Sequence, residues 1–168
     1  ADLIEAQQEA KKAGKIRFAG FSTHAGHDVV IPAGIKTGKF DVILTTYNFA
    51  MDKQRLDALI QSAADAGVGI VAMKVMAGAF QLPDMSASAR EMVKRPGVGL
   101  AALKWALRNP NLVAIPSMSD MDQLDQNFKA MSVPFGPADE KLLVAQLEHI
   151  RPLYCRTCGQ CEGTCQMG

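Results

Sequence analysis

The segment LVAIPSMSDMDQLDQNF, residues 112–128, joins an apolar run to a polar turn and the start of a helix. The run ends at Pro116, which has no backbone N–H and therefore ends a ladder of hydrogen bonds. Asp120 is a favourable N-cap residue, and Leu124 and Phe128 share one face of the helix that follows. Free N–H groups of a first helical turn attract anions, so this corner is predicted to bind a phosphate group. An ordinary strand-to-helix connection is the alternative.

The sequence before this segment repeats one pattern three times: a helical stretch, a glycine and an apolar run. The helical stretches cover residues 3–13, 28–36 and 52–66, and the apolar runs cover residues 16–21, 40–45 and 68–73. A helix at 98–108 precedes the fourth apolar run, and a last helix is expected at 138–151. Nearly apolar strands that alternate with helices predict an α/β fold with four parallel strands buried on both faces.

Four parallel strands can form a small open sheet or half of an eight-stranded barrel. No glycine-rich fingerprint follows the first strand, so the open dinucleotide-binding sheet is less favoured. We therefore predict half of a (β/α)8 TIM barrel in residues 1–151, whose missing strands lie elsewhere on the polypeptide or on a second chain. Because the sequence does not begin with Met and stops soon after Cys165, both ends are expected to continue into a longer protein.

Composition and charge exclude several classes of partner. The 168 residues are 48% apolar and 21% charged, which is typical of a globular domain. A formal net charge of +1, with both signs interspersed, gives no reason to expect a nucleic acid or a membrane surface as partner. No run is long enough to span a membrane, and the polar N-terminal stretch is not a signal peptide.

Four cysteines lie within residues 152–168, which form a separate cysteine-rich motif. Cys155, Cys158, Cys161 and Cys165 have the spacing C-x2-C-x2-C-x3-C, which favours a [4Fe–4S] cluster. Structural zinc and free or disulfide-linked thiols are the alternatives. Because a cluster needs reduced thiols during assembly, the expected location is cytoplasmic, unless a missing N-terminal part carries an export signal.

Several segments together resemble the aldo/keto reductases, and most closely their iron-sulfur branch. The segments are GKIRFAGFSTH (14–24), FDVILTTYNF (40–49), GVGIVAMKVMAG (67–78), ALKWALRNPNLVAIPSMSDMDQLDQN (102–127) and the cysteine motif. The resemblance covers almost the whole chain and is most specific from Trp105 to Asn127. It implies the C-terminal half of the family's barrel, from the helix before the fifth strand onward.

The resemblance implies residues at the nicotinamide end of an NADP or NAD cofactor. Ser22 and Thr23 match the family's Ser-Asn pair that holds the carboxamide, with Thr in place of Asn. Leu44 stands where the family usually has a Gln for the same group. Met73 stands where an aromatic ring usually stacks on the nicotinamide.

It also implies residues at the adenosine end. Ser117, Met118 and Ser119 match the family's phosphate corner, and Gln126 and Asn127 match its adenine-contacting pair. Gln123 stands where many relatives have an Arg against the 2′-phosphate. The preference between NADP and NAD is therefore left open.

The resemblance implies an oxidoreductase that transfers hydride to a small-molecule carbonyl. The family's catalytic Asp, Tyr, Lys and His come from the missing first half, so Tyr47, Lys74 and His24 are not those residues. The chain alone is predicted to be inactive, and no catalytic residue is assigned to it. Two alternatives are a non-catalytic iron-sulfur module for electron transfer or scaffolding, and a zinc-knuckle interaction module.

Overall fold

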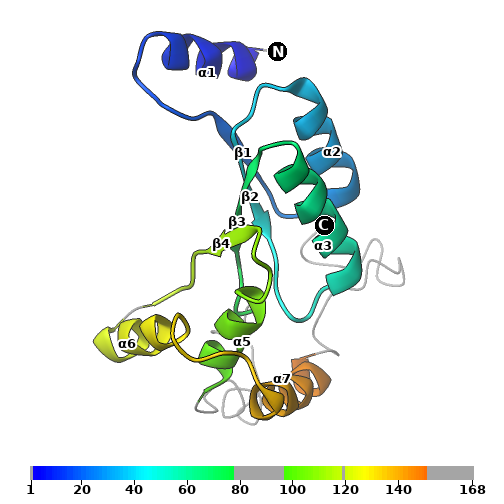
Figure 1. Cartoon of the computed structure of the whole chain (residues 1–168), viewed down its shortest axis with the longest axis vertical. Coiled ribbons are helices and arrows are strands. Elements are labelled where there is room, and N and C mark those ends of the chain that lie inside the picture. The colour runs from blue at the N-terminus through cyan, green and yellow to red at the C-terminus, as the bar shows by residue number, and fades with distance from the viewer. Residues whose placement is uncertain (1, 78–96, 119, 151–168) are drawn as a thin grey trace, which may run out of the picture.

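A computed structural model of the chain describes residues 2–77, 97–118 and 120–150 (Figure 1). In chain order its elements are α1 (Asp2–Lys12), β1 (Gly20–Thr23), α2 (His27–Thr37), β2 (Val42–Thr46), α3 (Lys53–Asp65), β3 (Gly69–Met73), α5 (Val98–Ala106), β4 (Leu112–Ala114), α6 (Met121–Lys129) and α7 (Pro137–Ile150). The four cysteines and Ser119 lie outside the described residues, so the predictions for them stay predictions.

The four strands form one parallel sheet in the order β1-β2-β3-β4, so neighbours in sequence are neighbours in space. This arrangement confirms the predicted α/β class with four parallel strands. In the described part of the chain, β1 and β4 are edges that do not pair with each other. The described sheet is therefore open.

The first strand begins later than the predicted range of 16–21. Gly20 lies opposite Val42, the first residue of β2, so the residues before Gly20 have no described strand beside them. Ala19 is held instead by its backbone N–H, which donates to the Asp41 carboxylate at 2.8 Å. A strand needs a ladder partner, and apolar sequence alone did not show where that partner begins.

One face of the sheet is covered by helices and contains the hydrophobic core. Figure 1 shows α2 and α3 side by side on the same side of the strands. Tyr47, which follows β2, packs against Trp105 of α5 with ring centroids 5.0 Å apart. Helix α2 approaches β1 closely, because a Cβ at Gly34 would lie 2.5 Å from the Phe21 ring. We call this side the helix-covered face.

Helix α7 is attached to α5 by a buried ion pair. Lys104 of α5 is only 7% exposed, and its ammonium lies 2.5 Å from the Asp139 carboxylate. The same carboxylate accepts a hydrogen bond from the Gly136 N–H at 2.8 Å, at the start of α7. Burial raises the pKa of Asp139, but the hydrogen bonds from Lys104 and Gly136 outweigh it and hold the pKa below its usual value.

Large apolar side chains are exposed along β4, the segment after it and α6. Phe128 and Met131 are each 76% exposed, although a single helix normally buries its apolar face. We call this surface the β4–α6 edge; it consists of Val113, Ile115, Met121, Leu124, Phe128 and Met131. None of the helices in the described ranges is long and apolar enough to cross a membrane.

Candidate cofactor site

The face of the sheet opposite the helices carries one side chain from each strand at the same level. Ser22, Leu44, Val71 and Val113 are register partners across the four strands, so their side chains point to the same face. All four are exposed or half-buried. Ile43, which precedes Leu44 and therefore points to the other face, is fully buried. We call this side the open face. The carboxyl ends of parallel strands meet at one edge, where such folds place their sites.

Ser22 and Thr23, which were predicted to act together, lie on opposite faces of β1. Ser22 is exposed on the open face. Thr23 is 8% exposed, and its hydroxyl donates to the Ala25 carbonyl at 2.7 Å, which closes the turn after β1. The structure therefore leaves Ser22 available to a ligand and uses the Thr23 hydroxyl within the chain.

Thr46 and Met73 are register partners at the carboxyl ends of β2 and β3. They follow Leu44 and Val71 by two residues and so share the open face. The Thr46 hydroxyl oxygen is buried and has no hydrogen-bond partner among the described residues. Leaving a buried hydroxyl unpaired costs free energy, so a ligand that supplies the missing bond is favoured here. Sequence reasoning missed Thr46, because threonine is a common strand residue and only the unpaired atom distinguishes it.

The turn after β4 is closed by side chains of α6. The Asp120 carboxylate accepts from the Gln123 N–H at 2.8 Å, which confirms the predicted N-cap. The Asn127 side-chain amide donates to the Ser117 carbonyl at 3.3 Å. Because Asp120 brings a negative charge to the N-terminus of α6, it offsets part of the attraction that this end has for a phosphate.

The predicted adenosine-end residues differ in accessibility. Gln126 and Met118 are exposed, whereas Asn127 is 8% exposed and faces the turn. The Gln123 side chain donates to the second Asp120 oxygen at 2.8 Å. Gln123 is thus held against a carboxylate, which is an unfavourable neighbour for a 2′-phosphate.

His24 follows β1 directly, and His27 begins α2 near the same edge of the sheet. Arg55 of α3 forms an ion pair with Asp28 in this region. Burial, followed by the charges of Arg55 and His24, lowers the pKa of His27 below its usual value. His27 is therefore mainly neutral at pH 7. No group of three or more His, Cys, Asp or Glu side chains in the described ranges is arranged to bind a metal ion.

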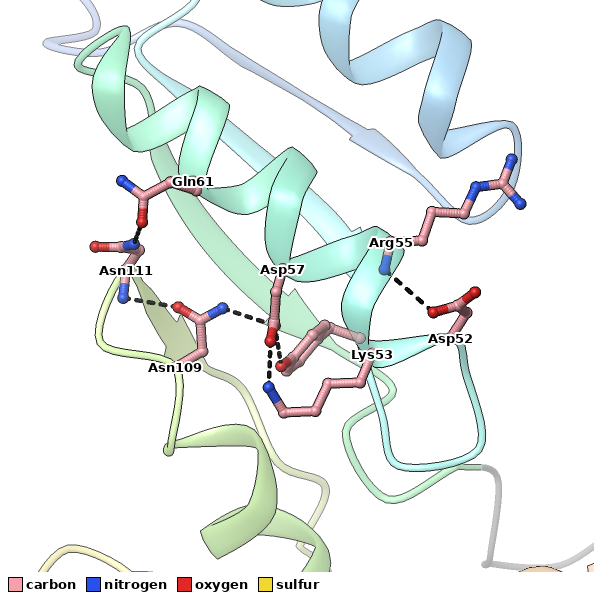
Figure 2. A network of polar contacts seen from close by, with 8 residues as sticks. Asp52, Lys53, Arg55, Asp57, Gln61, Asn109 and Asn111 are labelled. Carbon is pink, nitrogen blue, oxygen red and sulfur yellow. Dashed lines mark hydrogen bonds and ion pairs between the residues drawn. The ribbon is translucent and has the colours of Figure 1, made fainter.

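A Tyr, an Asp and a Lys also come together, but on the helix-covered face; Figure 2 labels the Asp and the Lys, which are Asp57 and Lys53. The Tyr47 hydroxyl donates to Asp57 at 2.7 Å, Lys53 forms an ion pair with the same carboxylate, and Asn109 donates to it at 3.0 Å. Burial and then the Asp57 carboxylate raise the pKa of Tyr47 well above its usual value. Tyr47 is also fully buried and its hydroxyl already donates to Asp57, so we interpret this cluster as structural.

Figure 2 shows how the same network continues toward the start of β4. The Asn111 N–H donates to the Asn109 side chain at 2.9 Å, and the Asn111 amide donates to Gln61 at 2.7 Å. Helix α3 is thereby joined to the connection between α5 and β4. The hydrogen bonds of this cluster run between its own members, which supports a structural role.

A small hollow of about 110 Å³ lies between α5 and α7. It is lined by Phe49, Trp105, Arg108, Phe135, Glu140, Leu143 and Val144. None of the predicted site residues lines it. The candidate site is therefore the carboxyl edge of the open face and not this hollow.

Comparison with known proteins assigns the fold to a family. The family model described as "Aldo/keto reductase family" matches residues 1–147. The chain belongs to the aldo/keto reductase family. No match is found among curated protein sequences.

Solved aldo-keto reductases have the same fold as this family member. The holo form of one from Bacillus halodurans is 23% identical with a TM-score of 0.57, and the match covers 90% of this chain and 55% of that one. One from Klebsiella pneumoniae in complex with NADPH is 23% identical with a TM-score of 0.60, covering 89% and 53%. The chain spans just over half the length of these structures. At this level of identity the likeness establishes the fold alone.

Proposed function

We propose that this chain is the cofactor-binding half of a nicotinamide-dependent aldo/keto oxidoreductase that reduces a small-molecule carbonyl. The observation that carries the proposal is the carboxyl edge of the open face, with Ser22, Thr46 and Met73 on three neighbouring strands. Parallel-strand folds bind their ligands at this edge. The NADPH bound by the Klebsiella pneumoniae relative supports a nicotinamide dinucleotide as the ligand.

The polar groups of the open face fit the carboxamide end of a nicotinamide. Ser22 offers an exposed hydroxyl, and Thr46 offers a buried hydroxyl that lacks a partner among the described residues. A hydroxyl both donates and accepts, so two of them match the carbonyl and amino groups of a carboxamide. Leu44 cannot make the bond of the family's Gln, and Thr46 replaces it in this proposal. Met73 gives the ring a soft apolar surface in place of an aromatic side chain.

When bound, the nicotinamide supplies the hydride. Ser22 and Thr46 would fix the rotation of the ring through its carboxamide, and Met73 would limit the access of water to it. The group that protonates the carbonyl oxygen is assigned to the missing half of the barrel. The isolated chain is accordingly expected to reduce no carbonyl.

The adenosine end would be held by the β4–α6 turn, with Ser117, Met118, Ser119, Gln126 and Asn127 as the predicted contacts.

We infer a preference for NAD over NADP, because Gln123 is held by the Asp120 carboxylate. Gln123→Arg should raise the affinity for NADPH relative to NADH by about tenfold, since Arg pairs well with phosphate. Gln54→Arg, at an exposed position of α3, is the matched control and should leave the ratio unchanged. An unaltered ratio in Gln123→Arg would contradict the assignment.

The cysteine motif in residues 152–168 is proposed to bind a [4Fe–4S] cluster, with zinc as the alternative. The proposal rests on the spacing of Cys155, Cys158, Cys161 and Cys165. An anaerobic visible spectrum with iron, sulfide and zinc analysis tests it. Iron and sulfide in equal amounts support the cluster and a cytoplasmic protein, whereas one zinc per chain would make the motif a structural staple.

Residues 1–151 are proposed to be completed by the other half of a barrel, on the same polypeptide or on a second chain. The open β1 and β4 edges and the exposed β4–α6 edge support this completion, because unpaired strand edges and apolar patches of this kind normally meet a partner. Co-purification of the completed barrel as one species, with the β4–α6 edge protected from exchange, is the expected result.

A non-catalytic iron-sulfur module for electron transfer or scaffolding is the second candidate function. The departures at Leu44 and Met73 favour it, because they remove two contacts that the family makes to the nicotinamide. Titration of the completed barrel with NADH and NADPH separates the two candidates. Binding with turnover of a carbonyl supports the reductase, and a redox-active cluster without nucleotide binding supports the alternative.

A further inference from the structure

The hollow between α5 and α7 has apolar buried walls and two charged groups at its exposed rim. Its most buried lining residues are Phe49, Trp105 and Leu143, each 8% exposed or less, and we call these three the floor. Arg108 and Glu140 also line the hollow, and both are exposed. A concave apolar surface with a few convergent polar groups is the usual form of a small-molecule site.

The two helices beside the hollow are held together by contacts next to its lining residues. Lys104 precedes Trp105 in α5, and its buried ammonium pairs with Asp139, the residue before Glu140 in α7. Trp105 itself packs against the ring of Tyr47. Because these contacts already fix the walls, a ligand has little ordering to impose when it binds, which favours affinity.

The two charges at the rim do not neutralise each other. Arg108 and Glu140 have opposite charges and line the same hollow, but neither forms an ion pair with the other or with any residue that the structure describes. The Arg108 guanidinium lies 4.9 Å from the centre of the Phe135 ring, which also lines the hollow and supports the guanidinium in place. The rim therefore offers one positive and one negative group, farther apart than an ion pair.

We propose that this hollow binds a small aliphatic α-amino acid of about the size of valine. The carboxylate would pair with Arg108, whose planar guanidinium matches a carboxylate, and the ammonium would pair with Glu140. The aliphatic side chain would lie against the floor. A cavity of about 150 Å³ binds benzene, so a hollow of about 110 Å³ suits an aliphatic group smaller than a phenyl ring.

A zwitterion fits better than a ligand with a single charge, because it gives a partner to both rim groups. Three probes of the same carbon skeleton test this. L-valine carries both charges, isovalerate lacks the ammonium and isobutylamine lacks the carboxylate. Valine should bind the completed barrel with a Kd of about 1 mM, which is ordinary for so small a ligand. Each of the other two should bind about fivefold more weakly.

The binding is measured by NMR on the indole N–H of Trp105. Trp105 is the single tryptophan of this chain, and it lies in the floor. Its signal in the completed barrel is identified by its loss in Trp105→Phe. Titration with valine should shift this signal and saturate. A signal that valine does not move at 20 times the expected Kd, about 20 mM, would overturn the proposal and leave a hollow that holds only water.

Two substitutions at the rim should change which probe is preferred. Glu140→Gln should weaken valine binding about fivefold and remove the preference for valine over isovalerate, because the ammonium loses its partner. Arg108→Gln should weaken it similarly and remove the preference over isobutylamine. Glu148→Gln is the matched control, since Glu148 is an exposed carboxylate of α7 that does not line the hollow. It should bind all three probes as the native protein does.

The exchange of preferences separates recognition from a merely structural role of the two residues. A substitution that only loosened the helices would weaken the three probes alike, and that result would overturn the proposal. Equal binding of valine, isovalerate and isobutylamine by the native protein would overturn it as well. None of these results depends on whether the completed barrel binds a nicotinamide cofactor, so the proposed function and this inference can fail separately.

Discussion

Large side chains are buried on the helix-covered face and exposed at the β4–α6 edge. On the helix-covered face, Tyr47 is fully buried against Trp105, and its hydroxyl is paired with Asp57. At the β4–α6 edge, Phe128 remains largely exposed on the well-capped helix α6, and Met131 remains largely exposed just after it. Local structure is equally regular in both regions, so the difference lies in what packs against them.

This difference indicates which part of the fold is complete within the described residues. On the helix-covered face a polar network joins α3 to the start of β4, and the apolar groups share one core. The β4–α6 edge has the apolar side chains typical of a buried element, but the described residues leave them exposed. The four predictions below are ordered from the largest expected effect to the smallest.

Trp105→Ala should cause the largest loss of stability. Trp105 is 8% exposed and contacts the ring of Tyr47, so truncation leaves a cavity in the core. The free energy of unfolding should fall by about 3–5 kcal/mol, measured by urea denaturation. Phe128→Ala is the matched aromatic control at the exposed edge. Similar losses for the two variants would remove the distinction between the regions.

Asp57→Ala should cost less, about 2 kcal/mol, because it leaves the buried Tyr47 hydroxyl without its acceptor. Asp57→Asn keeps an oxygen acceptor and should lose less. Thermal or urea unfolding measures both. An Asp57→Ala chain as stable as the native one would mean that the network of Figure 2 contributes nothing.

The dependence of stability on pH in acid tests the role of Asp57 in a second way. Burial raises the pKa of Asp57, but hydrogen bonds from Lys53, Tyr47 and Asn109 outweigh it and lower the pKa below 3.8. A carboxyl group with a lowered folded-state pKa stabilises the fold above that reference value and loses this contribution as pH falls below it. Asp57→Asn lacks the titrating group, so its stability should fall less steeply below about pH 4.

Thr46→Val should change cofactor binding more than stability. The substitution keeps the shape and removes the unpaired hydroxyl, so NADH affinity should fall about fivefold while the fold is unharmed or slightly stabilised. Thr45→Val is a close control: its hydroxyl is also buried and unpaired within the described ranges, but it lies on the helix-covered face. Equal affinities for the two variants would exclude Thr46 from the site.

Phe128→Ser should have the smallest effect on the isolated chain. The ring is 76% exposed, so the free energy of unfolding should change by less than about 0.5 kcal/mol. In the completed barrel the same substitution should weaken association with the other half, measured by analytical ultracentrifugation or pull-down of separately expressed halves. Loss of stability in the isolated chain would show that the ring is already packed.

Sequence reasoning performed well where a local signal determines structure. Gly38 ends α2 and Asp120 caps α6, as glycine and N-cap chemistry predict. It failed where structure depends on a neighbour. The first strand was placed too early because its start depends on β2, and the partners of Thr23 and Asn127 depend on turns that close back on the chain.

The candidate site could be predicted only in part for the same reason. Motif matching singled out Ser22 and Gln126, which are exposed at the expected places. It could not identify Thr46, which stands out only because its buried hydroxyl lacks a hydrogen-bond partner among the described residues. It also could not identify the buried Asn48, whose side-chain amide donates to the Lys74 carbonyl. These features depend on which atoms meet across neighbouring strands, and the linear sequence does not show this.

The strand order β1-β2-β3-β4 also has a consequence for how this chain is made. Each strand pairs with the one synthesised just before it, so the segment that must close is shorter, and the entropy lost in closing it smaller, than if strands distant in sequence were paired. The sheet can therefore grow strand by strand as the polypeptide leaves the ribosome. In the proposed barrel, β4 is the last strand to be made, and its exposed apolar side chains are covered when it meets the half synthesised earlier or a second chain.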